Sequence, residues 1–130
     1  MKRLLLTAAV LAATGFAGSV AAQERGPLSI DDSLICAGLF FAQSQLPENA
    51  GYPEGVENYR TITGVFLDRA EILAGREGAS TDWHTERAAQ TAAFLIGEVD
   101  AAADARARYA VIASWQGAED ECMAGGRVPV

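Results

Sequence analysis

The chain has 130 residues, a length that suits one domain with a single hydrophobic core, and its formal net charge at neutral pH is −7. An acid excess of this size repels nucleic acids and anionic lipid surfaces, and it favours a basic partner. The composition therefore argues against a nucleic-acid-binding protein and against a second domain.

The first 22 residues have the order of a secretory signal peptide. Lys2 and Arg3 precede an apolar run, and small residues follow it as far as Ala22. A basic start, an apolar middle and small residues before the cleavage point are typical of such a peptide. We expect residues 1–22 to be removed, leaving one domain over residues 23–130 with no stable membrane insertion. Loss of Lys2 and Arg3 would take the net charge from −7 to −9.

The number of cysteines indicates an oxidising compartment. The chain has two cysteines, Cys36 and Cys122, so each is the only intrachain partner of the other. Exported proteins with such a pair normally hold it as a disulfide. We therefore expect a Cys36–Cys122 bond and a periplasmic or secreted location.

Apolar spacing predicts a first helix from Ile30 to about Gln45. Ser29 and Asp32 form a variant of the capping box before it, and Pro47 cannot continue it. The side chains that it should bury are Ile35, Cys36, Leu39, Phe40 and Ala42.

A second helix is expected from about Pro53 to about Ala74, ended by Gly75 and Gly78. Its apolar face should consist of Val56, Tyr59, Thr63, Phe66, Ala70 and Leu73. Gly64 lies inside this helix, where glycine costs about 1 kcal/mol relative to alanine. We interpret Gly64 as the point of a close helix crossing, or else as the side of a functional cleft.

A third helix is expected from about Asp82, with Ser80, Thr81 and Asp82 as the source of its cap. Its core face is made mainly of small residues: Ala88, Ala92, Leu95, Val99 and Ala102. A single helix from residue 82 to residue 116 would overhang its neighbours by about half its length at 1.5 Å per residue. We therefore place a break at residues 101–104.

The fourth helix should begin at its cap, Asp104, and end near Met123. The residues of its apolar face, spaced i, i+4, i+7 and i+11, are Val111, Trp115, Ala118 and Cys122. Four helices with short connections predict an all-α, up-down-up-down four-helix bundle. In that topology the end of the fourth helix lies beside the start of the first, so the predicted disulfide fits it.

The residues required for common catalytic and cofactor sites are missing or badly spaced. Covalent haem attachment needs C-x-x-C-H, and His84, the only histidine, follows neither cysteine. Asp82, His84 and Glu86 are two residues apart, which spreads side chains around a helix, so His84 should be a surface residue. No nucleophile turn such as G-x-S-x-G is present. We expect no enzyme activity, no cofactor and no metal site built from these three side chains.

Five carboxylates are predicted to meet around the disulfide at one end of the bundle: Asp31, Asp32, Glu119, Asp120 and Glu121. Such a cluster can be a solvated rim, a docking face for a basic protein, a weak Ca²⁺ site or a pH-responsive edge. Trp83, after the cap of the third helix, can cover the core or be an exposed contact residue. These six residues are the candidate partner-binding set.

The sequence thus predicts a non-catalytic exported bundle that binds another protein through its acidic surface. In size, expected location, helical content and single disulfide it is similar, in class only, to small exported immunity proteins and to periplasmic acid-stress chaperones. It has no residue motif of either. The alternative is a carrier of a small ligand or cofactor, with a pocket inside the bundle near Gly64 and the alanine face of the third helix.

Overall fold

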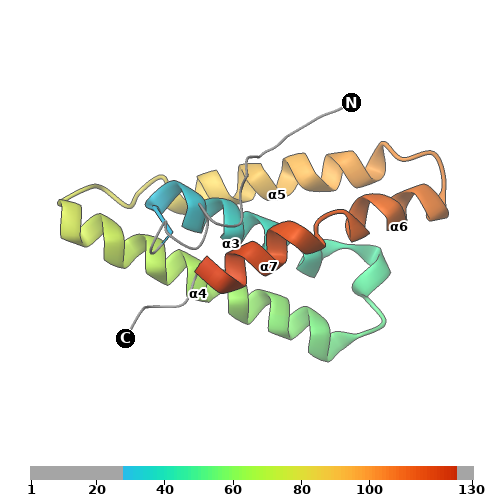
Figure 1. Cartoon of the computed structure of the whole chain (residues 1–130), viewed down its shortest axis with the longest axis horizontal. Coiled ribbons are helices and arrows are strands. Elements are labelled where there is room, and N and C mark those ends of the chain that lie inside the picture. The colour runs from blue at the N-terminus through green and yellow to red at the C-terminus, as the bar shows by residue number, and fades with distance from the viewer. Residues whose placement is uncertain (1–27, 126–130) are drawn as a thin grey trace.

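The computed structural model describes residues 28–125, so the predicted signal peptide lies outside the described residues. The elements in this range are α3 (Ile30–Gln45), the 3₁₀ turn η1 (Pro47–Asn49), α4 (Pro53–Glu77), α5 (His84–Asp100), α6 (Ala105–Ala113) and α7 (Gln116–Gly125). The chain reverses direction between α3 and α4, between α4 and α5, and between α5 and α6 (Figure 1). The predicted all-α, up-down-up-down bundle is confirmed, with its fourth segment divided into α6 and α7.

The helix at the centre of the bundle is α3, which packs on α4, α5 and α7 (Figure 1). Its predicted cap is confirmed, because Ser29 Oγ accepts a hydrogen bond from the backbone N–H of Asp32 at 3.1 Å. Ile35 was predicted to be buried, but it is 44% exposed. The reason is its position one residue before Cys36, which turns it about 100° around the helix from the side that faces α7.

The close helix crossing is at Gly38 and not, as predicted, at Gly64. A Cβ at Gly38 would lie 2.6 Å from the Thr91 Cβ and 2.7 Å from the Ala88 carbonyl oxygen. At Gly64 a Cβ would meet nothing within 4 Å. The small residues of α5 therefore permit close contact with α3, as expected, but the glycine that matches them is on α3.

Aromatic side chains join α3 to α4. The rings of Phe40 and Phe66 are stacked with centroids 5.9 Å apart, and the Tyr59 ring is 6.2 Å from that of Phe40. The predicted end of α4 at Ala74 is too early, because α4 continues to Glu77. It ends where Gly78 adopts a left-handed conformation with φ 68°, which glycine reaches without a steric penalty.

The start of α5 also differs from the prediction. Ser80 Oγ accepts from the Asp82 N–H at 3.2 Å, which stabilises a turn before the helix, and α5 begins at His84. Ala88, Ala92 and Val99 are buried, as the sequence predicted for this face.

The last predicted helix is interrupted. Asp104 Oδ1 accepts from the Ala107 N–H at 2.8 Å, which confirms the cap, but α6 ends at Ala113. The chain then turns at Ser114 and Trp115 before α7 begins. In this region Trp115 and Cys122 are buried, Glu119 is partly buried, and Ala118 is exposed. Trp115 is buried, as predicted, with 6% of its surface exposed.

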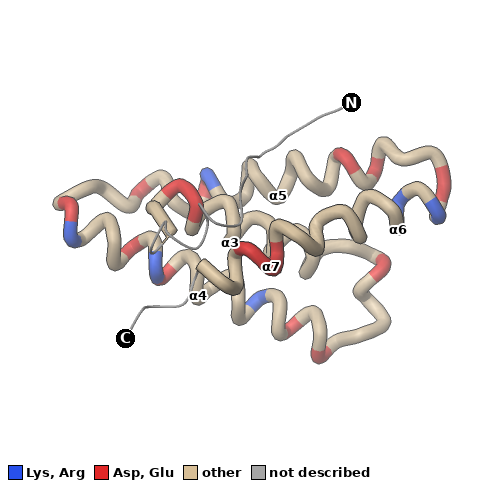
Figure 2. The backbone as a smooth tube through the Cα atoms, in the orientation of Figure 1, with Lys and Arg blue, Asp and Glu red and all other residues tan. Residues whose placement is uncertain are grey.

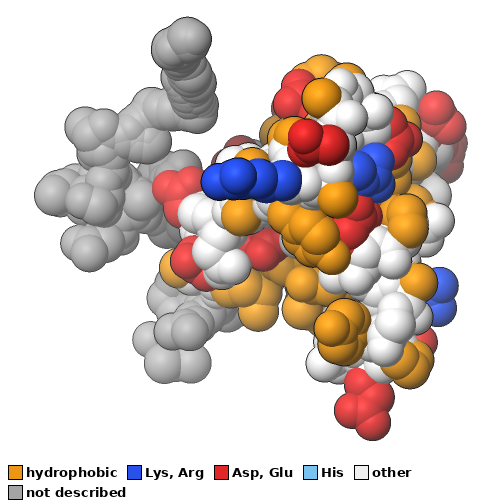
Figure 3. Space-filling model, turned by 90° about the vertical axis from the view of Figure 1, so that its right-hand side faces the viewer, with side chains coloured by type: hydrophobic (Ala, Val, Ile, Leu, Met, Phe, Trp, Pro, Cys, Tyr) orange, Lys and Arg blue, Asp and Glu red, His pale blue; other side chains and the backbone are white. Residues whose placement is uncertain are grey.

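At the end of the molecule shown in Figure 3, the side chain of Arg108 connects α6 to η1 and to the end of α5. Arg108 of α6 binds Glu48 of η1 with Nε–Oε2 at 2.6 Å and Nη2–Oε1 at 3.2 Å, and its Nη1 is 2.9 Å from Asp100 Oδ1. Hydrophobic, acidic and basic side chains are interspersed on this end face (Figure 3). Among residues 28–125, no helix combines the length and the apolar character needed to cross a bilayer.

Candidate functional site

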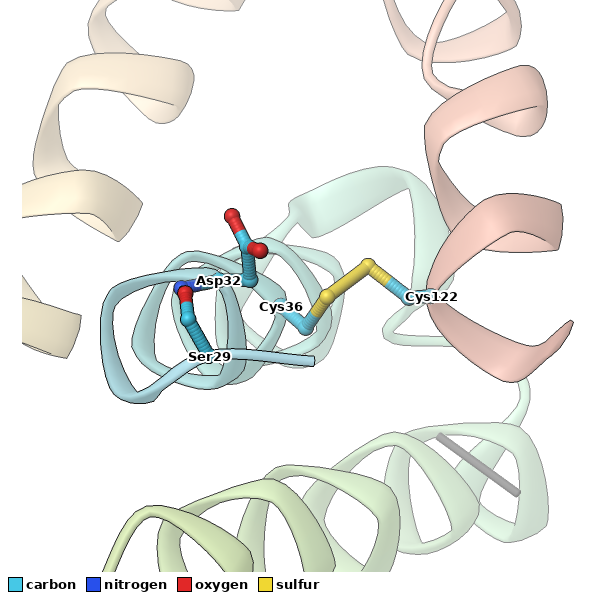
Figure 4. The surroundings of a disulfide bond; sticks show 4 residues. All are labelled: Ser29, Asp32, Cys36 and Cys122. Atoms are coloured by element: carbon cyan, nitrogen blue, oxygen red, sulfur yellow. A yellow bond between two sulfur atoms is a disulfide. The ribbon is translucent and has the colours of Figure 1, made fainter. Parts of the chain in front are cut away.

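The predicted disulfide is confirmed. Cys36, in the second turn of α3, is bonded to Cys122 near the end of α7, with their Cα atoms 5.8 Å apart and a sequence separation of 86. Both half-cystines are buried. Figure 4 shows the bond reaching from α3 to α7, with Asp32 one turn before Cys36 on α3 and Ser29 at the N-cap of that helix. The bond therefore fixes the start of the first helix against the end of the last.

Two large apolar residues that neighbour the half-cystines in the sequence are exposed to solvent. Ile35 and Met123 are each next in sequence to one half-cystine, and they are 44% and 45% exposed. Consecutive Cα atoms are 3.8 Å apart, so the Cα atoms of Ile35 and Met123 lie within about 13 Å of each other. We call Asp31, Asp32, Ile35, Glu121 and Met123, which lie within five residues of Cys36 or Cys122 in the sequence, the disulfide face.

The five predicted carboxylates do not form one cluster, so that prediction is wrong. Figure 2 shows two separate acidic stretches, one at the start of α3 and one on α7. Glu119 Oε2 accepts a hydrogen bond from Gln43 Nε2 at 2.6 Å, and Gln43 lies about 16 Å farther along α3 than Asp32. Asp120 accepts from Gln116 within α7 at 2.9 Å. The reason is the antiparallel direction of α7, since residues before Cys122 meet α3 progressively farther from its start.

Glu119 belongs instead to a polar junction between α3 and α7 that the sequence analysis missed. Gln43 is 5% exposed, and its Oε1 accepts from Asn49 Nδ2 at 2.9 Å. Burial raises the pKa of the Glu119 carboxyl, and the charge of Asp120 adds to this while the Gln43 hydrogen bond opposes it. Burial and the nearby Glu119 charge raise the pKa of Tyr59. One residue in the sequence could have indicated this junction. Gln43 is a polar residue at i+7 from Cys36, so it lies on the buried face of α3 and needs a polar partner there.

A pocket of about 200 Å³ lies between the second half of α4 and the start of α5. Its lining residues are Leu67, Asp68, Glu71, Thr81, His84 and Thr85. It is one turn farther along α4 than Gly64, the position near which a pocket was expected. The structure thus has a small, mainly polar hollow beside this part of α4.

The prediction that His84 is a surface residue is wrong. His84 is 5% exposed, and its Nε2 is buried without a hydrogen-bond partner in the described part of the chain. The Trp83 ring packs edge-on against the imidazole at 4.8 Å, and Trp83 Nε1 donates to the Ser80 carbonyl at 3.1 Å. Trp83 remains 44% exposed, so it both covers His84 and presents a surface to solvent.

Within residues 28–125, no three His, Cys, Asp or Glu side chains come together in a way that could hold a metal ion.

Fold and site together define a disulfide-closed helical bundle with an apolar and acidic surface beside its crosslink. Compared with known protein families, with curated proteins and with solved structures, the chain has no match. Its function must be argued from its own residues.

Proposed function

We propose that this protein is an exported, non-catalytic bundle that binds another protein, and that the partner has a basic surface with an apolar centre. The observation that supports this most directly is the exposure of Ile35 and Met123, which are the sequence neighbours of the two half-cystines. Apolar side chains that are grouped on a surface and surrounded by polar residues are typical of protein contact sites.

The charge of the disulfide face favours a cationic partner. Asp31 is exposed and Asp32 is partly exposed at the start of α3, and Glu121 is exposed on α7. The whole chain has a formal net charge of −7. Complementary charge accelerates the encounter of two proteins and disfavours partners of the same sign.

The rigidity of this surface is a second support. The disulfide holds α3 to α7, and the Ser29 cap fixes the first turn of α3. A surface that is ordered before binding loses less conformational entropy when the partner arrives. The same bond supports the proposed exported location, because disulfides persist in oxidising compartments.

The test compares two pairs of exposed apolar residues. The oxidised protein is immobilised, proteins retained from a periplasmic extract are identified, and the purified partner is titrated by calorimetry. Ile35→Ser with Met123→Ser should weaken binding at least tenfold. The matched control is Val65→Ser with Ile72→Ser on α4, residues that are 51% and 57% exposed, and it should leave binding unchanged.

The charge contribution is measured in the same titration. Asp31→Asn with Asp32→Asn should weaken binding in low salt and have less effect in high salt, because salt screens exposed charges. Equal losses for the Ile35 and Val65 pairs, or no partner retained by the parent protein, would contradict the proposal.

A further inference from the structure

The side of α5 that faces away from the core has large aromatic side chains exposed to solvent. Ala88, Ala92 and Val99 on the inner side are buried. At about 100° per residue, Phe94 lies on the opposite side of the helix, where it is 66% exposed. Trp83, directly before α5, is 44% exposed. In Figure 1, α5 lies along one edge of the molecule, so this side is open to contact with another molecule.

Opposite charges lie on either side of Phe94 along this helix. Arg87 is seven residues before Phe94 and Glu98 is four residues after it, so both lie within about 40° of it around the helix axis. Both side chains are exposed, and within residues 28–125 neither takes part in an ion pair. We call Trp83, Arg87, Phe94, Glu98 and the exposed Ala101 the outer face of α5.

We infer that the outer face of α5 pairs with the same face of a second copy of this chain, with the two helices antiparallel. Arg87 of each copy then lies opposite Glu98 of the other, and twofold symmetry forms this ion pair twice. The two Phe94 side chains are offset by three residues, or about 4.5 Å along the axis, a separation at which aromatic rings stack favourably. Trp83 of each copy lies at the Ala101 end of the other, where small side chains leave room for an indole ring.

The charge pattern selects both the partner and its direction. Parallel helices would bring Arg87 against Arg87 and Glu98 against Glu98, which is repulsive. The face has one positive and one negative side chain, so it is complementary to itself, whereas the disulfide face favours a basic protein. The two faces share no residue, and the inference does not depend on the proposed function.

The expected dimer is weak. One helix pair covers less area than a standard interface of about 1,600 Å², and two copies that each have a net charge of −7 repel each other. Aromatic and arginine side chains are those that contribute most at protein interfaces, and the outer face contains three of them. We therefore expect monomers at low micromolar concentration and dimers at high micromolar concentration.

Sedimentation velocity of the oxidised protein over this concentration range measures the association. Phe94→Ser should raise the dissociation constant at least tenfold, because it removes the aromatic contact near the twofold axis. The matched control is Ile72→Ser on α4, a residue that is 57% exposed and outside the outer face, and it should leave the constant unchanged. Circular dichroism establishes that each variant is folded. A parent protein that stays monomeric throughout, or equal weakening by both variants, would overturn the inference.

A charge exchange tests the antiparallel arrangement. Arg87→Glu places two acids opposite each other and Glu98→Arg places two arginines opposite each other, so each variant alone should associate at least tenfold more weakly. In an equimolar mixture of these two variants every such contact joins an acid to an arginine, so association should return. Arg76→Glu and Glu77→Arg make the same charge changes at exposed positions of α4 and should have no effect, alone or mixed. A mixture that stays monomeric, or an equal response of the α4 variants, would show that the copies do not pair through this face.

Discussion

The core of α3, α4 and α5 and the C-terminal arm, defined as residues 105–125, are attached in different ways. In the core, α3 is packed along most of its length, with Leu34, Ala37 and Phe40 buried and Gly38 directly against α5. None of the described residues of α6 is buried, and α7 buries only Cys122.

The arm is held at a few separate points. These are the Arg108 ion pairs, the partly buried Val111 and Ile112 that pack against the core, the Trp115 side chain, the Glu119–Gln43 hydrogen bond and the Cys36–Cys122 disulfide. The core is therefore held by packing along whole helices, whereas the arm depends on a small number of contacts. We expect the arm to open locally before the core unfolds, because it has few buried apolar contacts.

The largest expected effect is loss of the disulfide. Cys36→Ala with Cys122→Ala should lower the free energy of unfolding by about 4 to 5 kcal/mol in the chain-entropy treatment of a closed loop of this length. Denaturant unfolding of the oxidised parent and the variant measures the difference. In hydrogen exchange, amides of α7 should lose protection before those of α3. Uniform loss of protection in both regions would show that arm and core are not distinct units.

Two large-to-small substitutions, one in the arm and one in the core, test whether these two regions open separately. Trp115→Ala and Phe66→Ala should each cost about 3 to 5 kcal/mol, because both side chains are buried. With the disulfide intact, Trp115→Ala should increase exchange mainly in α6 and α7, and Phe66→Ala should increase it throughout α3 and α4. An effect of Trp115→Ala below about 1 kcal/mol would mean that this side chain does not anchor the arm.

The packing of the core is tested by a pair of glycines. Gly38→Ala should destabilise the protein by about 1 to 3 kcal/mol, since its new methyl group would overlap backbone and Cβ atoms of α5. Gly64→Ala is the matched control and should stabilise α4 by about 0.5 to 1 kcal/mol, because nothing lies within 4 Å of its Cβ position. Thermal unfolding with calorimetry measures both, and a neutral Gly38→Ala would contradict the close helix contact.

The smallest effects are those of pH on two anchors of the arm, and they have opposite signs. The Arg108 guanidinium lowers the pKa of Glu48 below its ordinary value of 4.5, so the stability that this pair provides is lost as pH falls through the folded-state value. Burial raises the pKa of Glu119, so the folded protein binds more protons at this carboxyl than the unfolded chain does. The stability that Glu119 provides is therefore lost as pH rises through the folded-state value.

Melting temperatures measured against pH separate these two groups. Glu48→Gln should remove pH dependence mainly below pH 4.5, and Glu119→Gln should remove it mainly above pH 4.5. Glutamine at position 119 keeps an oxygen that can accept from Gln43, so the variant changes the charge and not the contact. The same pH dependence in both variants would show that the shifts do not come from these carboxyl groups.

Local sequence signals were sufficient for much of the fold. The Ser29 and Asp104 caps, the apolar face of α4 and the cysteine positions each follow from short-range spacing, and together they predict the bundle and its crosslink. The contact of Glu119 with Gln43 was missed because apolar spacing assigns glutamate to solvent and selects Ala118, one residue earlier. The actual contact depends on Gln43, a residue far away in sequence, so only the folded structure brings the pair together.

The candidate sites were less predictable for the same reason. Whether a glycine marks a close contact depends on the neighbouring helix, which distinguishes Gly38 from Gly64 only after folding. His84 has the spacing of a surface residue on its own helix, yet packing of α5 against α4 and Trp83 buries it. Burial by another element leaves no periodic signal in the sequence.

The disulfide also changes what a single broken peptide bond does to the molecule. Every residue from 37 to 121 lies inside the covalent loop that Cys36 and Cys122 close. A protease that cuts once in the exposed connection between α4 and α5 would therefore open the loop without releasing a fragment. The nicked chain keeps its mass on a non-reducing gel and separates into two bands only after reduction.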